Sequence, residues 1–367
     1  MPQPPAATAP RLASLDFMRG LIMVLLALEG TELYEHLAEA AAGSPLQPVM
    51  LQFFHHPWHG LRFWDLVQPA FMFMAGVALA FSLRKQYALG MTWTQSRWKI
   101  LRRCGWLFFW GVLDYAVRPN GLSFELWDVL TQLSFTTLVA FLIFRWPAWA
   151  QLATCAGVLL LTEILYRFTQ VPGFDQPFVD QRNFGNYMDL VLMNKINRDG
   201  WVAINCVPTA VHTIAGALAG KWLAQGVPEI KKLFLWGLLC LVLGYGLDIL
   251  GITPIIKRIA TTSFTLASLG WCLWMLGACY QWIDVLGHRK RLKFFVVVGM
   301  NSLFLYLFFE IVGHRWFNGY VGSITNGLMQ IGHISGIVSA VITSLCIFIL
   351  EWELCYFLYK RQIFFKL

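Results

Sequence analysis

The segment FWDLVQPAFMFMAGVALAFSL, residues 63–83, decides the fold class of this chain. It carries one charged residue, Asp65, at its start and is otherwise as apolar as a bilayer-crossing helix, which takes about 20 such residues. The whole chain is 57% hydrophobic and 13% charged, whereas soluble globular proteins are about 25% charged. About ten comparable segments follow one another, near residues 16–35, 63–83, 99–117, 127–146, 148–168, 203–224, 232–251, 262–284, 294–313 and 336–358. These features predict an all-α polytopic membrane bundle.

The distribution of basic residues predicts the topology. With the N-terminus in the cytoplasm, the inner loops carry about twice as many Lys and Arg residues as the outer ones, as the positive-inside rule requires. We therefore expect both termini inside. Residues 1–15 are predicted to be a short cytoplasmic segment and 16–367 a single transmembrane domain. The Gly-rich stretch 317–333 is predicted to be a loop or a short re-entrant piece.

Composition also excludes several classes of protein. No basic region precedes the first apolar segment, so we expect a retained span rather than a cleaved signal peptide. The eight cysteines form no CxxC pair and lie in apolar segments, which argues against a disulfide framework or a metal site. The net charge of +8 is accounted for by topology, so no nucleic-acid partner is expected. Membrane lipids are expected partners, and a homodimer stays open.

A histidine-rich loop precedes the 63–83 segment. It reads His55-His56-Pro57-Trp58-His59-Gly60. Histidine can act as a base or nucleophile near neutral pH, and titratable groups next to hydrocarbon are costly and usually functional. Three histidines at spacings of one and three form no recognised zinc pattern, so we predict chemistry without a metal. The alternative is that these side chains are merely interfacial and solvent-exposed.

Acidic residues near the membrane have two interpretations each. Asp65 either caps the second span or orients a histidine, and the two roles are compatible. Asp16 and Arg19, three apart, lie on one helix face and can pair. Either Asp16 caps the helix start while Arg19 snorkels, or the two form the charged rim of a cofactor entrance. Glu29 lies deeper in the first span and is a site candidate by default, or a satisfied structural group.

Several later segments also carry buried polar groups, and a basic stretch follows the second span. Asn301 and Ser302 either tie helices together or take part in chemistry. Tyr306 and Glu310 lie four apart and share one helix face. The basic residues either enforce topology or bind a phosphate-rich ligand. The groups in question are Gln132, His212, Asn301, Tyr306 and Glu310, and the basic ones include Lys99, Arg102 and Arg103.

Several motifs resemble those of the heparan-α-glucosaminide N-acetyltransferase family. The opening R-x-x-S-x-D-x-x-R-G matches residues 11–20, and the block H-x-x-W-x-G…D-L…P-x-F-x-F…G matches residues 55–76. Weaker matches follow in order over nearly the whole chain, at residues 186–189, 199–200, 208–220, 262–264 and 299–306.

The resemblance implies a transmembrane acyltransferase. Such enzymes take acetyl from cytoplasmic acetyl-CoA and deliver it to a sugar or other glycan acceptor across the membrane. The family's essential histidine precedes the tryptophan by three residues, which is His55 here, with His56 in reserve. On this basis we predict that Asp65 orients His55 and that Asn301 stabilises the oxyanion. Acceptor contacts are predicted for His56, Trp58, Glu29, Gln132 and Tyr306, and contacts to acetyl-CoA for Asp16, Arg19, Lys99, Arg102 and Arg103.

Two positions depart from the family pattern. The family's L-Q-R in the fourth span is Leu130-Thr131-Gln132-Leu133 here, without the arginine, and Glu29 replaces a neutral polar residue. The acceptor, the choice between N- and O-acetylation and the choice between direct and ping-pong transfer therefore stay open.

A rival class is a proton-coupled transporter, in which Glu29, Glu310 and His212 would relay protons. The chain lacks the repeated halves and paired broken helices that are typical of alternating access. The compact ten-span form favours a bacterial plasma-membrane protein.

Overall fold

Helices form the whole framework of the described part of the chain. The computed structural model describes residues 12–117, 121–226, 229–334 and 336–365. Arg11, the rest of residues 1–11 and Lys366 lie outside it. The described residues contain no β-strand beyond one isolated bridge. The all-α prediction is confirmed.

The first half of the chain contains the helices around the histidine loop. They are α1 (Ala13–Gly30), α2 (Leu33–Ala40), α3 (Gln47–Met50), η1 (Leu51–Phe53), η2 (Phe63–Leu66), α4 (Val67–Ala88), α5 (Trp93–Ala116), α6 (Val129–Leu142), α7 (Ala148–Phe168) and α8 (Phe184–Met193).

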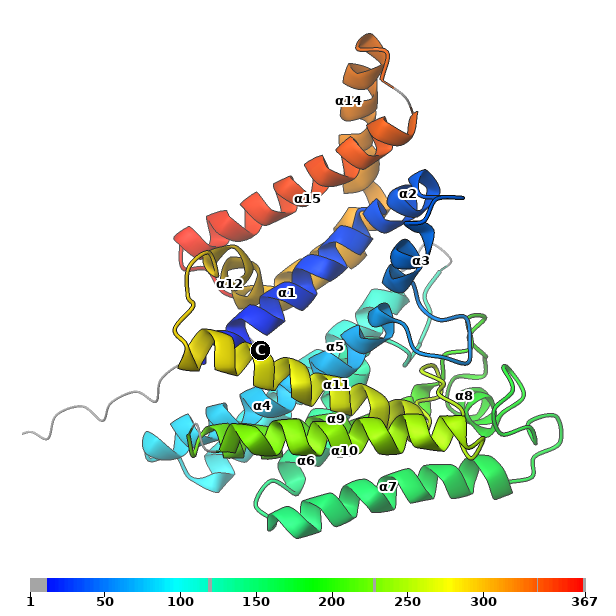
Figure 1. The fold of residues 1–367 in the computed structure, drawn as a ribbon, viewed down its shortest axis with the longest axis vertical. Coiled ribbons are helices and arrows are strands. Elements are labelled where there is room, and N and C mark those ends of the chain that lie inside the picture. Colours follow the sequence, from blue (N-terminus) through cyan, green and yellow to red (C-terminus); the bar gives the residue numbers. More distant parts are fainter. Residues whose placement is uncertain (1–11, 118–120, 227–228, 335, 366–367) are drawn as a thin grey trace, which may run out of the picture.

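The second half completes the bundle. Its helices are η3 (Ala203–Asn205), α9 (Cys206–Leu223), α10 (Ile230–Ile249), α11 (Thr262–Cys279), η5 (Tyr280–Val285), α12 (Lys293–Met300), α13 (Ser302–Phe308), η6 (Phe309–Phe317), α14 (Asn318–Ile331) and α15 (Gly336–Lys360). In Figure 1, α7, α10 and α11 run side by side, while α14 and the start of α15 project from the body.

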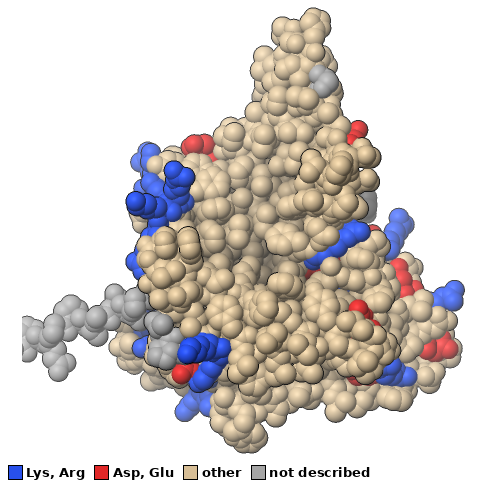
Figure 2. Space-filling model, in the orientation of Figure 1, with Lys and Arg blue, Asp and Glu red and all other residues tan. Residues whose placement is uncertain are grey.

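Six described helices are long and apolar enough to cross a membrane, or up to seven if the bent pair Lys293–Met300 and Ser302–Ile331 is one span. Each of the ten predicted segments overlaps a helix. However, α1 carries Asp16, Arg19 and Glu29, α5 carries several basic residues, and α6 is short. Figure 2 shows charged side chains gathered toward two opposite sides, with a largely uncharged band between them. The structure thus supports an integral membrane protein, while the count of ten and the orientation stay predictions.

Of the two interpretations of residues 317–333, the loop was wrong, and a short re-entrant piece stays a prediction. These residues continue the helix from η6 into α14, and a bend of 72° falls instead at the break after Met300. In the α14–α15 contact, Thr325 Oγ1 lies 2.6 Å from Thr343 Oγ1. Because a bilayer offers no water to backbone groups, a helix is favoured there despite the glycines.

Close contact between α4 and α9 forms the centre of the bundle. Glycines at the crossing let the two backbones touch: a Cβ on Gly216 would lie 2.0 Å from Phe73 O, and one on Gly76 2.0 Å from Thr213 O. Small residues allow this kind of helix packing in membranes. The α4–α9 pair therefore holds the start of α4, and with it the histidine loop, in one position.

We expect Gly216→Ala to destabilise the protein by about 1–3 kcal/mol, because the added methyl overpacks the α4–α9 crossing. Thermal unfolding in detergent would show a lower midpoint. Gly157→Ala in α7 is the matched control, since nothing lies within 4 Å of its new Cβ. Equal midpoints for the two variants would contradict the close approach.

Candidate active site

The loop at residues 54–62 is held in shape by its own glycine and by the 250–261 segment. Gly60 has φ +143°, and a Cβ there would lie 2.6 Å from the His56 ring. Its N–H donates to Ile255 O at 2.8 Å, and His59 forms an antiparallel bridge with Ile256. Glycine is thus required at this position, and the loop is fixed against the α10–α11 connection.

Two predicted residues of this loop act as anchors. Trp58 donates its indole N–H to Phe178 O at 2.8 Å and packs in the cluster that contains Tyr166 and Ile259. His59 Nε2 lies 2.7 Å from Asp248 Oδ1, and the His59 side chain is 56% exposed. Both contacts attach the loop to distant segments, which leaves His55 and His56 for chemistry.

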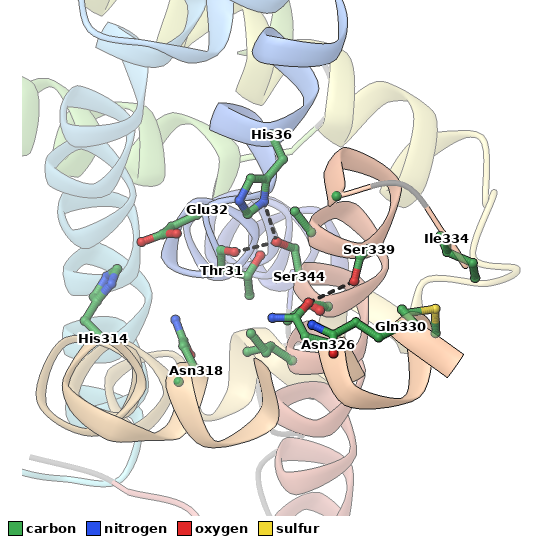
Figure 3. A pocket seen from close by; sticks show the side chains of 16 residues that line it. Thr31, Glu32, His36, His314, Asn318, Asn326, Gln330, Ile334, Ser339 and Ser344 are labelled. Atoms are coloured by element: carbon green, nitrogen blue, oxygen red, sulfur yellow. Dashed lines mark hydrogen bonds between the residues drawn. The ribbon is translucent and has the colours of Figure 1, made fainter. Parts of the chain in front are cut away.

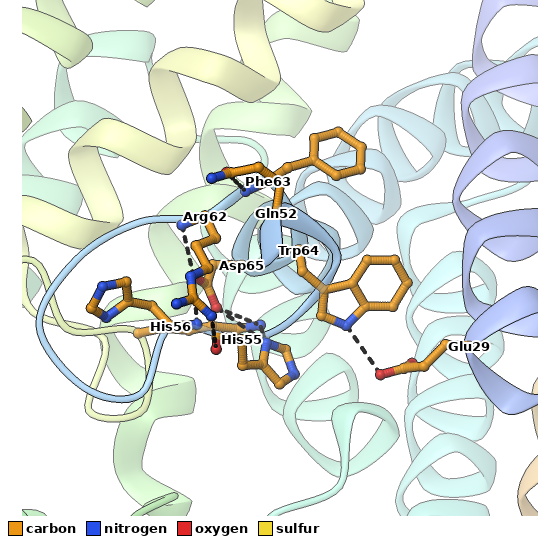
Figure 4. A network of polar contacts seen from close by, with 9 residues as sticks. Glu29, Gln52, His55, His56, Arg62, Phe63, Trp64 and Asp65 are labelled. Atoms are coloured by element: carbon orange, nitrogen blue, oxygen red, sulfur yellow. Dashed lines mark hydrogen bonds and ion pairs between the residues drawn. The ribbon is translucent and has the colours of Figure 1, made fainter. Parts of the chain in front are cut away.

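His55 and Asp65 are in direct contact. His55 Nδ1 lies 3.1 Å from Asp65 Oδ1, and Asp65 is fully buried (Figure 4). Asp65 Oδ2 accepts the backbone N–H groups of Arg62 at 2.9 Å and His56 at 3.2 Å. Asp65 therefore caps the turn and contacts the histidine, which is the geometry that an orienting role requires; that role stays a prediction.

Lys257 is a third member that sequence reasoning missed. Its Nζ lies 3.0 Å from His55 Nδ1 and 3.7 Å from Asp65 Oδ1. The lysine is buried, and its ammonium lies 5.3 Å from the centre of the Trp201 ring, which also meets the His55 ring edge-on. A lysine flanked by apolar Ile255, Ile256 and Ile259 was the available signal.

The surroundings keep His55 neutral. Burial, and then the Lys257 cation, lower the pKa of His55 to about 4. Burial also lowers the pKa of Lys257 to about 8. At neutral pH the imidazole is therefore uncharged. With its proton on Nδ1 it donates to Asp65 and leaves the Nε2 lone pair to act as base or nucleophile; with its proton on Nε2, Nδ1 accepts from Lys257.

Glu29 and His56 flank this centre. Trp64, next to Asp65, donates its indole N–H to Glu29 Oε1 at 3.1 Å. The charge of Glu29 also acts on Lys257. His56 Nδ1 is buried and has no hydrogen-bond partner among the described residues. In Figure 4, His56 lies on the far side of His55 from Glu29.

A cavity of about 570 Å³ lies between α1, α4, α5, α6 and α13. Arg19, Lys85 and Arg103 border it, and much of the remaining lining is apolar. Two of these cations were predicted as contacts to acetyl-CoA, and Lys85 was missed. Such a combination suits a ligand with phosphates at one end and a less polar arm.

One face of α4 lines this cavity. Lys85, Ser82, Ala78, Ala75 and Phe71 recur every three or four positions, which places them on a single helix face. The cavity face ends at Phe71. Gln68, one turn further, donates to Gln132 Oε1, and Asp65 lies in η2, just before α4.

Comparison with known proteins found no matching family model. Two curated relatives are similar over the whole chain. Mouse heparan-alpha-glucosaminide N-acetyltransferase is 24% identical, over 100% of this chain and 62% of its own length. The human protein of the same name is 23% identical, over 99% of this chain and 61% of its own length. This similarity supports a relationship to that family. The chain spans about three fifths of the length of these relatives.

Asn301 is not brought near His55. Its amide donates to Ile363 O at 3.1 Å and accepts from Phe365 N at 3.1 Å. A Cβ on neighbouring Gly299 would lie 2.8 Å from Asp16 O, at the start of α1. Glu29, at the histidine end, is 13 residues further along that helix, or about 20 Å. Asn301 therefore belongs to the basic end of the cavity.

Of the other residues predicted to contact acetyl-CoA, some line the cavity and some do not. Arg19 lines the cavity and its Nη1 lies 3.9 Å from Asp16 Oδ1. Arg103 lines it as well, whereas Lys99 and Arg102 are exposed and do not. The α1 start is capped by a different residue from the one considered: Asp284 accepts the backbone N–H groups of Ala13 and Ser14.

Tyr306 and Gln132 lie between the basic end of the cavity and the histidine. Tyr306 lines the cavity and donates to Asp128 Oδ2 at 2.8 Å. Gln132 donates to Trp127 O at 3.2 Å and accepts from Gln68. Asp128 and Asp114 are buried carboxyl groups that sequence reasoning did not single out. Polar groups thus continue from the cavity toward the histidine.

A second cavity, of about 630 Å³, lies between the α1–α2 corner, α14 and α15 (Figure 3). Its hydroxyl and amide groups largely satisfy one another: His36 Nδ1 lies 3.1 Å from Ser344 Oγ, which donates to Thr31 O, and Ser339 donates to Asn326. None of the side chains that contact His55 lines it, so we place the reaction elsewhere.

Among the residues that the structure describes, no group of three His, Cys, Asp or Glu side chains is arranged to hold a metal ion. All eight cysteines are free thiols.

Proposed function

We propose that this protein is a membrane acetyltransferase that moves acetyl from acetyl-CoA, bound at the basic end of the cavity, to a sugar or other glycan acceptor beside His55. The distant similarity to an N-acetyltransferase suggests acyltransferase activity. The observation that carries the proposal is the cavity along α4, which runs from Lys85 to Phe71 and ends six residues from Asp65, the partner of His55.

The donor is expected to enter from the cytoplasm. Arg19, Lys85 and Arg103 would hold its phosphates, and Asn301 would close that end of the cavity rather than serve the oxyanion. The apolar lining from Ala78 to Phe71 would accommodate the pantetheine arm. From Lys85 to Phe71 the cavity follows α4 for about 21 Å. The acetyl thioester would reach the histidine end by passing the Gln68–Gln132 contact beyond Phe71.

At that end the neutral His55 Nε2 has two chemical routes. As a base, it takes the proton of the acceptor amine or hydroxyl while that atom attacks the thioester carbon; CoA thiolate leaves and takes up the proton. As a nucleophile, Nε2 attacks the thioester carbon and CoA leaves as the thiolate; the acceptor then attacks the acetyl-imidazole, the imidazole is released, and the acceptor proton passes to the thiolate. Asp65 stabilises the imidazolium that either route creates. Lys257 is the nearest cation for the developing oxyanion.

The topology proposal adds α1, α5 and α6 to the apolar spans. This gives ten spans with both termini in the cytoplasm and His55 on the outer side. Support comes from the inner-loop basic residues and from the two charged sides in Figure 2. Location in a bacterial plasma membrane stays a prediction from the sequence.

The transporter alternative gains no support from its proposed relay. His212 is fully buried, its Nε2 lies 2.9 Å from Ser268 Oγ and its Nδ1 3.3 Å from Thr209 O. Both ring nitrogens are thus engaged in the core contact of α9 and α11, as in a structural histidine.

The proposal is tested by incubating the detergent-purified chain with radiolabelled acetyl-CoA and an amino sugar. Saturable binding and label in the sugar are expected. If the chain shows no binding and no transfer at millimolar acetyl-CoA, the proposal is contradicted. Solute uptake by proteoliposomes without acetyl-CoA consumption would favour transport instead.

We expect Lys257→Met to move the acid limb of the kcat/KM profile to higher pH. The limb lies near pH 4 in the wild type because His55 is active when neutral and its pKa is about 4. Removing a cation 3.0 Å from Nδ1 eases protonation, so the pKa of His55 rises toward its ordinary 6.5. Lys257→Arg keeps the charge and should keep the limb low. An unmoved limb in Lys257→Met would show that the lysine does not act on His55.

A further inference from the structure

A groove on the membrane side of the bundle reaches the histidine loop. Figure 1 shows α1 and α11 close together at the end where Asp284 caps α1, and diverging toward the other end. A space of about 470 Å³ lies where they diverge, floored by the start of α4. Since α1 and α11 belong to the proposed spans, this space would lie within the hydrocarbon region.

The groove is apolar along its length and polar at one end. Its walls include Leu21 and Leu25 of α1, Val67 of α4, and Trp271 and Met275 of α11. Gln52 and Arg62 lie at the histidine-loop end. On α1 the lining runs from Leu21 to Leu25, about 6 Å along the helix, and its aliphatic and aromatic side chains suit a lipid chain better than a free sugar.

Arg62 links the groove to the candidate catalytic centre. Its Nη1 donates to His55 O at 3.1 Å, and it forms no ion pair among the described residues. A guanidinium has five N–H donors and matches phosphate geometry. An anionic group held at Arg62 would therefore lie next to the residue that we propose receives or activates the acceptor.

We propose that the acceptor is a lipid-linked sugar, whose isoprenoid or acyl chain occupies this groove, whose phosphate binds Arg62 and whose sugar extends to His55. The inference rests on the proposed function and names its substrate class. Charge complementarity at Arg62, an apolar lining within the proposed spans and the direct contact of Arg62 with His55 all favour this occupant over a soluble glycan.

The test compares one amino sugar in two forms, free and carried on an isoprenoid phosphate, with acetyl-CoA as donor. The wild type should show at least about tenfold higher kcat/KM for the lipid-linked form, since its chain adds buried apolar area. Leu25→Trp fills the groove and should lower kcat/KM for the lipid-linked form by about tenfold while changing the free sugar little. Leu235→Trp, at a position on α10 that is 67% exposed and outside the groove, should behave as wild type.

A binding measurement separates this inference from the proposed function. Native mass spectrometry of the full chain with the sugar-bearing isoprenoid phosphate should show binding that Leu25→Trp loses and Leu235→Trp keeps. Equal binding by all three, or equal competition by phosphatidylglycerol, would overturn the groove assignment whether or not acetyl transfer is seen. Equal loss for both acceptors in Leu25→Trp would overturn it as well. Absence of transfer to either acceptor bears on the proposed function alone.

Discussion

Replacing His55 by alanine is expected to lower acetyl transfer by about a thousandfold, the usual contribution of a positioned acid–base group. The acceptor proton would have no base, and no nucleophile would replace the lost imidazole. Binding of acetyl-CoA should be unchanged, because Arg19, Lys85 and Arg103 lie at the other end of the cavity. Radiolabel transfer and equilibrium binding, measured on the same preparation, check both halves of the expectation.

His59→Ala is the matched control for this variant. His59 lies on the same loop and also contacts an aspartate, but its side chain is 56% exposed. Its loss should cost at most about 1 kcal/mol of stability, as for exposed ion pairs, and should leave most of the activity. A His55→Ala enzyme as active as His59→Ala would remove His55 from the mechanism.

Asp65→Asn is expected to reduce kcat by about a hundredfold to ten-thousandfold, as when the orienting aspartate of a Ser-His-Asp triad becomes asparagine. The amide oxygen can still accept from Arg62 N, so the turn should persist. What is lost is the carboxylate that keeps the proton on His55 Nδ1 and stabilises the imidazolium. Steady-state kinetics should show the loss in kcat, with KM for acetyl-CoA near that of the wild type.

Asp248→Asn provides the comparison. Asp248 bonds His59 at 2.7 Å, so it makes the same kind of contact at the surface of the same loop. Only the His55–Asp65 pair should matter for rate. Similar losses in the two variants would indicate that both aspartates merely shape the loop, and Asp65 would then have no role in orienting a reacting imidazole.

The His55–Asp65 pair could be predicted because it is local. Ten residues separate the two, and a loop followed by a helix start limits where their side chains can meet. Lys257 could not be placed in the same way. It comes from a connection 202 residues away, and its position depends on how the α10–α11 pair packs against the rest.

The residues on α5 that were predicted to contact acetyl-CoA show that the helical periodicity of this segment was not used. On α5, Ile100, Cys104 and Leu107 are buried, which defines the inner face, and Arg103 borders it, whereas Lys99 and Arg102 point outward. That phase was readable from the sequence. The role of Asn301 was not, because the helix break beside it and the return of residues 363–365 are tertiary features.

The late position of Lys257 in the chain has a consequence for biogenesis. A membrane protein is inserted from its N-terminus, so the His55–Asp65 pair can form once η2 and α4 are in place. At that stage His55 has neither a lysine neighbour nor the Trp201 ring against it. The imidazole acquires its burial against Trp201 and its lysine neighbour only when these later segments arrive. In incompletely inserted chains the pKa of His55 would therefore differ from that in the complete bundle. Acetyl transfer would begin only once the bundle is complete.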